Sequence, residues 1–192
     1  MLHFPLIFAS FLFGNLEVEK RAYLFDAFPV REVSYSSHLI ANVGFEGETI
    51  QFDDGSIWKV SPYDQRKAKS FGENITLTLT QNHRWFSRYS YRLVEKDSGI
   101  CLEANLARSP SIESPMTFTL FSVDGDLGLL SLTRQSGTPI RFEVSRSDLG
   151  TFASWLPHQL ILIGQNSGTE TPYSAILINA VTNQSVQARE LQ

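Results

Sequence analysis

Two stretches of the chain alternate apolar and polar residues with a period of two. Residues 75–80 read Ile-Thr-Leu-Thr-Leu-Thr, and residues 89–93 read Tyr-Ser-Tyr-Arg-Leu. Because successive side chains of a β-strand point to opposite faces, both patterns predict strands with one apolar face. Shorter runs at 49–53, 100–105 and 129–132 predict further strands, so the pattern favours an all-β fold.

The chain also resembles itself at a separation of 84 residues. Residues 58–104 align without a gap with residues 142–188. The alignment contains ten identical pairs, where ordinary residue frequencies give roughly three. We therefore predict an internal duplication. The identical pairs are Val60/Val144, Ser61/Ser145, Asp64/Asp148, Ser70/Ser154, Gln81/Gln165, Asn82/Asn166, Tyr89/Tyr173, Ser90/Ser174, Leu93/Leu177 and Ala104/Ala188.

Each copy carries a Ser-x-x-Asp sequence ahead of a short predicted helix. It runs from Ser61 to Asp64 in copy one and from Ser145 to Asp148 in copy two. This spacing is close to a capping box, in which both side chains bond to backbone N–H groups at the helix start. Asp64 and Asp148 also fit catalytic carboxylates. Their presence in both copies favours the capping role.

The predicted elements give an all-β fold of two diverged copies. Each copy is a small five-stranded, half-open antiparallel barrel of SH3-like or OB-like kind, with one short capped helical turn. An aromatic residue after each helix, Phe71 or Trp155, is predicted to close one end of its barrel. The predicted organisation is an N-terminal segment at 1–45, repeat 1 at 46–110 and repeat 2 at 111–192.

The N-terminal segment contains an apolar, signal-like run at residues 4–14. No Lys or Arg precedes this run, and no register offers small residues at both cleavage positions. The run is also too short to span a bilayer as a helix, so no transmembrane segment is predicted. Two hypotheses stay open: export, or a cytoplasmic protein whose segment packs on the barrels.

Copy two is more apolar than copy one on the face that should point outward. A strand that is apolar on both faces must be covered on both. The cover is predicted to be the segment 1–45, the other copy or another subunit, which allows a homo-oligomer formed through repeat 2. The positions that change are Thr76 to Leu160, Thr78 to Leu162 and Arg92 to Ile176.

Charge and cysteine content narrow the chemistry of the 192-residue chain. A net charge of -4 at pH 7 argues against nucleic-acid binding, which needs a concentrated basic surface. Cys101 is the single cysteine, which excludes an intrachain disulfide and a thiolate metal cluster. The four histidines share no metal-ligand spacing, so neither a metal nor a cofactor is expected.

One connection is rich in aromatic and basic residues and is the candidate binding site. Rings and arginines on a loop are typical of stacking or cation–π recognition. Trp85, Phe86 and Tyr91 align with Thr169, Glu170 and Ala175, so the shared fold does not require rings there. The alternative is that the loop folds over the barrel end and buries Trp85 against Trp58 or Phe71. The candidates are His83, Arg84, Trp85, Phe86, Arg88 and Tyr91.

The residues of copy one carry a resemblance. The run 54–64, Asn82, the Trp-Phe-Ser sequence at 85–87, Tyr89 and the Glu-Ala-Asn sequence at 103–105 resemble a repeat unit of small proteins from chlamydia-type bacteria. The resemblance covers copy one well, whereas copy two has Thr-Glu-Thr in place of Trp-Phe-Ser. It implies a bacterial origin, and it carries no assigned activity or catalytic residues.

Enzyme motifs for nucleophilic serine, phosphate, dinucleotide and zinc-protease chemistry are absent from the sequence. We therefore predict a non-catalytic interaction or scaffold protein that binds a protein or glycan partner through the aromatic loop of repeat 1. The second hypothesis is a carbohydrate- or peptidoglycan-binding envelope protein. The third is an enzyme in which Asp53, Asp54 and Glu103 converge in a cleft.

Overall fold

The computed structural model describes residues 34–135, 137–167 and 171–191, so the signal-like run 4–14 lies outside the described residues. The described elements are mostly strands, which confirms the all-β prediction. They are η1 (Ser34–Ser36), β1 (Ser37–Val43), β2 (Thr49–Phe52), β3 (Ile57–Val60), α2 (Gln65–Ala68), β4 (Thr76–Gln81), β5 (Tyr91–Glu95), β6 (Cys101–Arg108), β7 (Phe118–Asp124), β8 (Leu129–Thr133), β9 (Ile140–Val144), η2 (Arg146–Asp148), α3 (Leu149–Phe152), β10 (Leu160–Gln165), β11 (Ala175–Asn179) and β12 (Gln184–Leu191).

The strands β1 to β6 form a closed antiparallel barrel. Their order is β1-β2-β3-β6-β5-β4, and β1 pairs with β4 to close the barrel. The predicted five strands and half-open shape are therefore wrong, and the missed strand is β1, within the segment 1–45. Its inward residues are His38 and Ile40, so a histidine interrupts the apolar alternation. The His38 ring stacks on Phe52, with 4.9 Å between the ring centroids.

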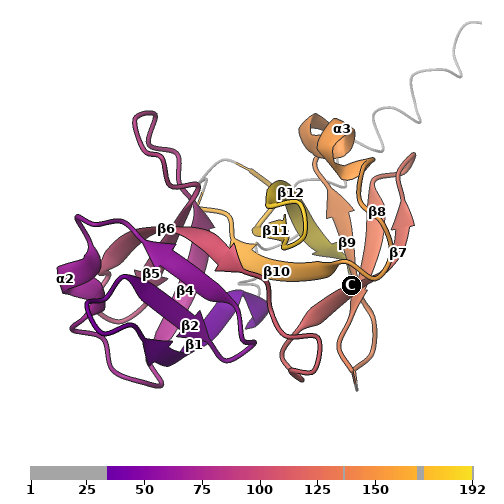
Figure 1. The fold of residues 1–192 in the computed structure, drawn as a ribbon. Coiled ribbons are helices and arrows are strands. Elements are labelled where there is room, and N and C mark those ends of the chain that lie inside the picture. Colours follow the sequence, from indigo (N-terminus) through magenta and orange to yellow (C-terminus); the bar gives the residue numbers. More distant parts are fainter. Residues whose placement is uncertain (1–33, 136, 168–170, 192) are drawn as a thin grey trace, which may run out of the picture. The chain divides into compact units, whose positions relative to one another are not determined.

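The strands β7 to β12 close in the same way. Their order is β7-β8-β9-β12-β11-β10, and Ile161 of β10 pairs with Phe118 of β7. Figure 1 shows this second group in orange and yellow with α3, and the first group in indigo and magenta with α2. A parallel pairing of Thr80 of β4 with Gln165 of β10 joins strands of the two groups.

Corresponding strand pairs of the two groups have the same register. Val60 pairs with Ala104 in the first group, and Val144 pairs with Ala188 in the second. Each of these residues is 84 positions from its counterpart, and the β4–β5 and β10–β11 ladders keep the same separation. Both valines are buried in the interior of their own barrel.

Other sequence predictions also agree with the described structure. The alignment of the copies pairs Gly99 with Asn183, which predicts a left-handed backbone at this turn, and their φ angles are 69° and 56°. This conformation suits glycine and asparagine better than most residues. The rings of Phe71 and Trp155 are buried in the hydrophobic clusters of the first and second groups.

The outer apolar face of β10 and β11 is covered by the first barrel. Leu162, Ile176 and Ile178 point away from their own interior and join the hydrophobic cluster of β1 to β6. The His38 Nε2–H group donates to the Ile163 carbonyl at 2.9 Å across this junction. Because the chain itself buries this face, the predicted homo-oligomer through repeat 2 loses its basis.

Candidate functional site: the aromatic turn

The β4–β5 connection presents two large aromatic rings to solvent. Trp85 is 89% exposed and Phe86 is 94% exposed. Their ring centroids are 6.0 Å apart and their planes are tilted by 44°. The alternative that Trp85 is buried against Trp58 or Phe71 is therefore wrong, because the loop does not fold over the barrel end. We call residues 84–87 the aromatic turn.

Hydrogen bonds within the connection fix the shape of the aromatic turn. The Ser87 backbone N–H donates to the Arg84 carbonyl at 3.1 Å, which closes the turn around the two rings. Below it, Asn82 accepts from the Arg84 backbone N–H at 3.2 Å through Oδ1 and donates to the Tyr89 carbonyl at 2.9 Å through Nδ2. One amide side chain thus spans the base of the connection.

Strand β6 holds the turn from the side. Glu103 binds Arg84 at 3.1 Å through Oε1 and accepts from the Ser87 hydroxyl at 2.9 Å through Oε2. Asn105 accepts from the Ser90 backbone N–H at 2.7 Å and donates to the Arg88 carbonyl at 3.0 Å. The rings therefore project from a preorganised turn, which loses little conformational entropy when it binds.

The other candidate residues divide into two groups. His83, Arg84 and Arg88 are exposed beside the rings, as predicted. Tyr91 is 1% exposed, and its assignment to the binding site is wrong. Its ring packs edge-on against Trp58 inside the barrel, with 5.5 Å between the centroids. Burial raises the pKa of the Tyr91 hydroxyl, against a weaker opposing effect from Ser185.

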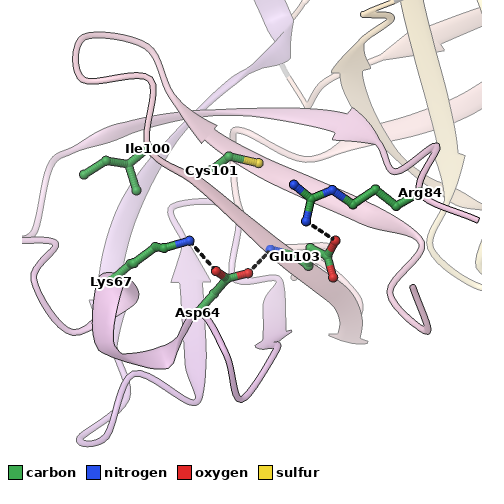
Figure 2. Close-up of a pocket in the computed structure, with 6 residues that line it drawn as sticks. All are labelled: Asp64, Lys67, Arg84, Ile100, Cys101 and Glu103. Carbon is green, nitrogen blue, oxygen red and sulfur yellow. Dashed lines mark hydrogen bonds and ion pairs between the residues drawn. The ribbon is translucent and has the colours of Figure 1, made fainter. Parts of the chain in front are cut away.

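A cavity of about 220 Å³ lies between α2, β6 and the aromatic turn (Figure 2). Lys67 Nζ lies 2.6 Å from Asp64 Oδ1, and Asp64 Oδ2 accepts from the Glu103 backbone N–H at 2.9 Å. On the opposite side Arg84 reaches the Glu103 carboxylate. Both cations that line the cavity are thus paired with a carboxylate. The lining residues are Asp64, Lys67, Arg84, Ile100, Cys101 and Glu103.

The predicted capping boxes do not form in either copy. Neither Asp64 nor Asp148 makes a side-chain cap bond to its helix, and neither does Ser145. Asp64 binds the backbone of β6 instead, and Asp148 Oδ2 accepts from the Gln187 backbone N–H of β12 at 2.7 Å. Tertiary packing brings a strand N–H closer to each carboxylate than the helix N–H groups. Ser61 is buried at this position.

The supports of the turn were largely missed by the sequence analysis. Asn82 was recognised as the counterpart of Asn166 and as part of the resemblance, but not as a support of the turn. Glu103 and Asn105 align with Gln187 and Arg189, so the comparison of the copies gave no signal for them. Their role is visible only once β6 lies beside the β4–β5 connection.

The three carboxylates of the enzyme hypothesis line different cavities. Glu103 lines the cavity beside α2, whereas Asp53 and Asp54 line a much smaller one near His38. Asp54 accepts from the Ser56 backbone N–H at 2.7 Å, and His38 Nδ1 lies 4.0 Å from its carboxylate. Burial raises the pKa of Asp53, Asp54 adds to this shift, and His38 opposes it.

The described part of the chain contains no group of three or more His, Cys, Asp or Glu residues that could hold a metal ion. None of its helices is long and apolar enough to cross a membrane.

Comparisons with known proteins add no relative. No protein-family model matches the chain, and no curated protein or solved structure matches it significantly. The resemblance to the chlamydia-type repeat unit therefore stays a prediction.

Proposed function

We propose that the protein is a non-catalytic binding protein that contacts its partner through the aromatic turn. The observation that carries this proposal is the exposure of Trp85 and Phe86 on a turn that a network of hydrogen bonds holds in place. Large rings exposed together on a protein surface mark interaction sites, and Trp and Arg are enriched among residues that dominate binding energy.

The proposal includes descent of the two barrels from one ancestral unit. The common registers 84 residues apart support it. The base of the connection supports it as well, because Asn166 Nδ2 donates to the Tyr173 carbonyl at 2.9 Å, as Asn82 does to Tyr89. A common scaffold with rings in one copy alone favours a function for the rings beyond folding.

A glycan partner is the second candidate, and the geometry of the turn favours it less. Sugar rings stack on flat aromatic faces and exchange hydrogen bonds with nearby polar side chains. Here the two rings are tilted by 44°. The side chains of Asn82, Glu103 and Asn105 already hold the turn.

Affinity capture from extracts of the source cell tests the proposal. The baits are the wild-type protein, the double variant Trp85→Ala/Phe86→Ala and the control Tyr63→Ala. Tyr63 is 94% exposed outside the turn, so the control removes a comparable ring. The proposal predicts a component retained by the wild type and the control and lost with the double variant. Identical components on all three baits would contradict it.

A titration of cell-wall fragments distinguishes the glycan candidate. The fragments are added to the same three purified proteins, and heat of binding is measured. Saturable binding that disappears in the double variant would establish a glycan partner. Binding that is equal in all three proteins would place any glycan contact away from the aromatic turn.

A further inference from the structure

We propose that the aromatic turn anchors the protein to a lipid surface that contains anionic lipid, by inserting Trp85 and Phe86 into the interfacial layer. This inference rests on the proposed function and names the partner of the same site. It follows from the shape of the turn, the state of its polar groups and the charges beside it.

The shape of the turn fits a bilayer better than a protein pocket. Both rings are almost fully exposed, and their tilt makes a convex tip instead of a flat platform. Two aromatic side chains bury about 300–500 Å², less than the roughly 600 Å² that each partner buries in a small stable protein interface. Insertion into a bilayer has no such threshold, because its strength rises steadily with the apolar area that is buried.

The polar side chains of the connection are committed to holding the turn. Asn82, Ser87 and Glu103 form their hydrogen bonds within the chain, so they give little directional recognition to a partner. A lipid interface needs no directional hydrogen bonds. Trp in particular prefers the boundary between headgroups and acyl chains, because its ring is apolar and its indole N–H is polar.

Basic residues flank the rings on both sides in the sequence. His83 and Arg84 precede them and Arg88 follows, and all three are exposed. Arg84 is paired with Glu103, whereas Arg88 forms no ion pair with the described residues. An arginine close to an anionic lipid surface strengthens binding by about five-fold. The positive charge of Arg88 beside the rings thus stands out from a chain whose net charge is -4.

Tryptophan fluorescence gives a direct test, because the other two tryptophans are buried. Trp58 is fully buried and Trp155 is 2% exposed, so a change in emission on binding reports on Trp85. The full chain is mixed with vesicles of phosphatidylcholine alone or of phosphatidylcholine with phosphatidylglycerol. We expect a blue shift and protection from acrylamide quenching, both stronger with the anionic vesicles. Lipids brominated near the headgroup should quench this emission.

Variants separate insertion from general adhesion. Phe86→Ala should weaken vesicle binding by about ten-fold, given the apolar area that is lost. Arg88→Glu should remove the preference for anionic vesicles and leave the wild-type fold. Tyr63→Ala and Phe121→Ala remove exposed rings outside the turn, and both should bind as the wild type does. Sedimentation with vesicles measures all four variants.

Three outcomes would overturn the inference. The first is an unchanged emission spectrum with both kinds of vesicle. The second is vesicle binding that Phe86→Ala and Tyr63→Ala reduce equally, which would make the turn no different from other exposed rings. The third is a membrane-free protein captured through Trp85 and Phe86 while vesicles do not bind. In that case the proposed function survives and the partner is a protein.

A separate outcome would contradict the proposed function as well. If Trp85 in the free protein already emits at short wavelength and resists quenching, its ring is covered in solution. The aromatic turn would then not be an exposed contact element for any partner.

Discussion

The β4–β5 and β10–β11 connections share equivalent hydrogen bonds near their ends but carry different side chains between them. In both, an asparagine side chain donates to a tyrosine carbonyl seven residues on. In both, the backbone N–H of that tyrosine donates to a hydroxyl two residues earlier. This hydroxyl belongs to Ser87 in the first connection and to Thr171 in the second. Only the first connection carries Trp and Phe. The bonds common to both specify the connection, and the rings are additional to it.

On the outer faces of the strands β4, β5, β10 and β11, it is the second copy that carries the larger apolar residues. Here the second barrel has the large apolar residues, with Leu162 and Ile176 where the first has Thr78 and Arg92. The junction between the barrels buries both of these apolar residues. The buried aliphatic residues of the second copy hold the two barrels together, whereas the exposed rings of the first copy pack on no other part of the barrels, and we propose that they contact a partner.

Leu162→Asp gives the largest expected effect, because it places a charge in the junction. Leu162 is 1% exposed and lies in the hydrophobic cluster of the first barrel. Loss of its packing alone costs about 2–5 kcal/mol, and an unpaired buried carboxylate adds to this. We expect the free energy of unfolding, measured in urea, to fall by at least this amount. Leu156→Asp, at a 63% exposed leucine, is the matched control and should change it little.

Gly164→Ala tests how closely the two barrels approach. A Cβ at this position would lie 2.4 Å from the Leu79 carbonyl oxygen and 2.7 Å from Ile176 Cγ1. Overpacking of this kind costs about 1–3 kcal/mol. Gly150→Ala adds the same methyl group where no neighbour lies within 4 Å, and in helix α3 it should be neutral or slightly stabilising. Equal melting temperatures for both variants would contradict the close junction.

Asp64→Asn and Asp148→Asn test the bond that replaced the predicted caps. Each change should cost about 1 kcal/mol, because a charge-assisted hydrogen bond becomes a neutral one. Amide hydrogen exchange should become faster at Glu103 in the first variant and at Gln187 in the second. Faster exchange in α2 or α3 alone would favour the capping role after all.

The sequence predicted local features well where neighbouring residues determine them. The alternation at 75–80 gave β4, and the Gly99/Asn183 pair gave the left-handed turn position. The aromatic turn was also found from the sequence, because its rings lack counterparts in the other copy. In each case the signal lies within a few residues of the feature that it predicts.

Features that depend on distant residues were missed. Asp64 bonds to a strand 39 residues further along the chain, and no spacing in the sequence reports that distance. Tyr91 was assigned to the site because its counterpart is Ala175. Both are buried, so a barrel interior accommodates a ring in one copy and a methyl group in the other. A difference between the copies at a buried position therefore does not identify a binding residue.

Trp85→Ala should have the smallest effect on stability. It tests directly whether the rings of the β4–β5 connection are dispensable for folding. Surface substitutions away from special features change the free energy of unfolding by about 0.5 kcal/mol or less, whereas truncating the buried Trp58 should cost about 3–5 kcal/mol. Both variants are measured by urea unfolding against the wild type. If Trp85→Ala costs as much as Trp58→Ala, the Trp85 ring stabilises the fold and is covered in solution. If the cost is negligible, the ring is dispensable for folding, and any loss of binding in the same variant reports a lost contact with the partner.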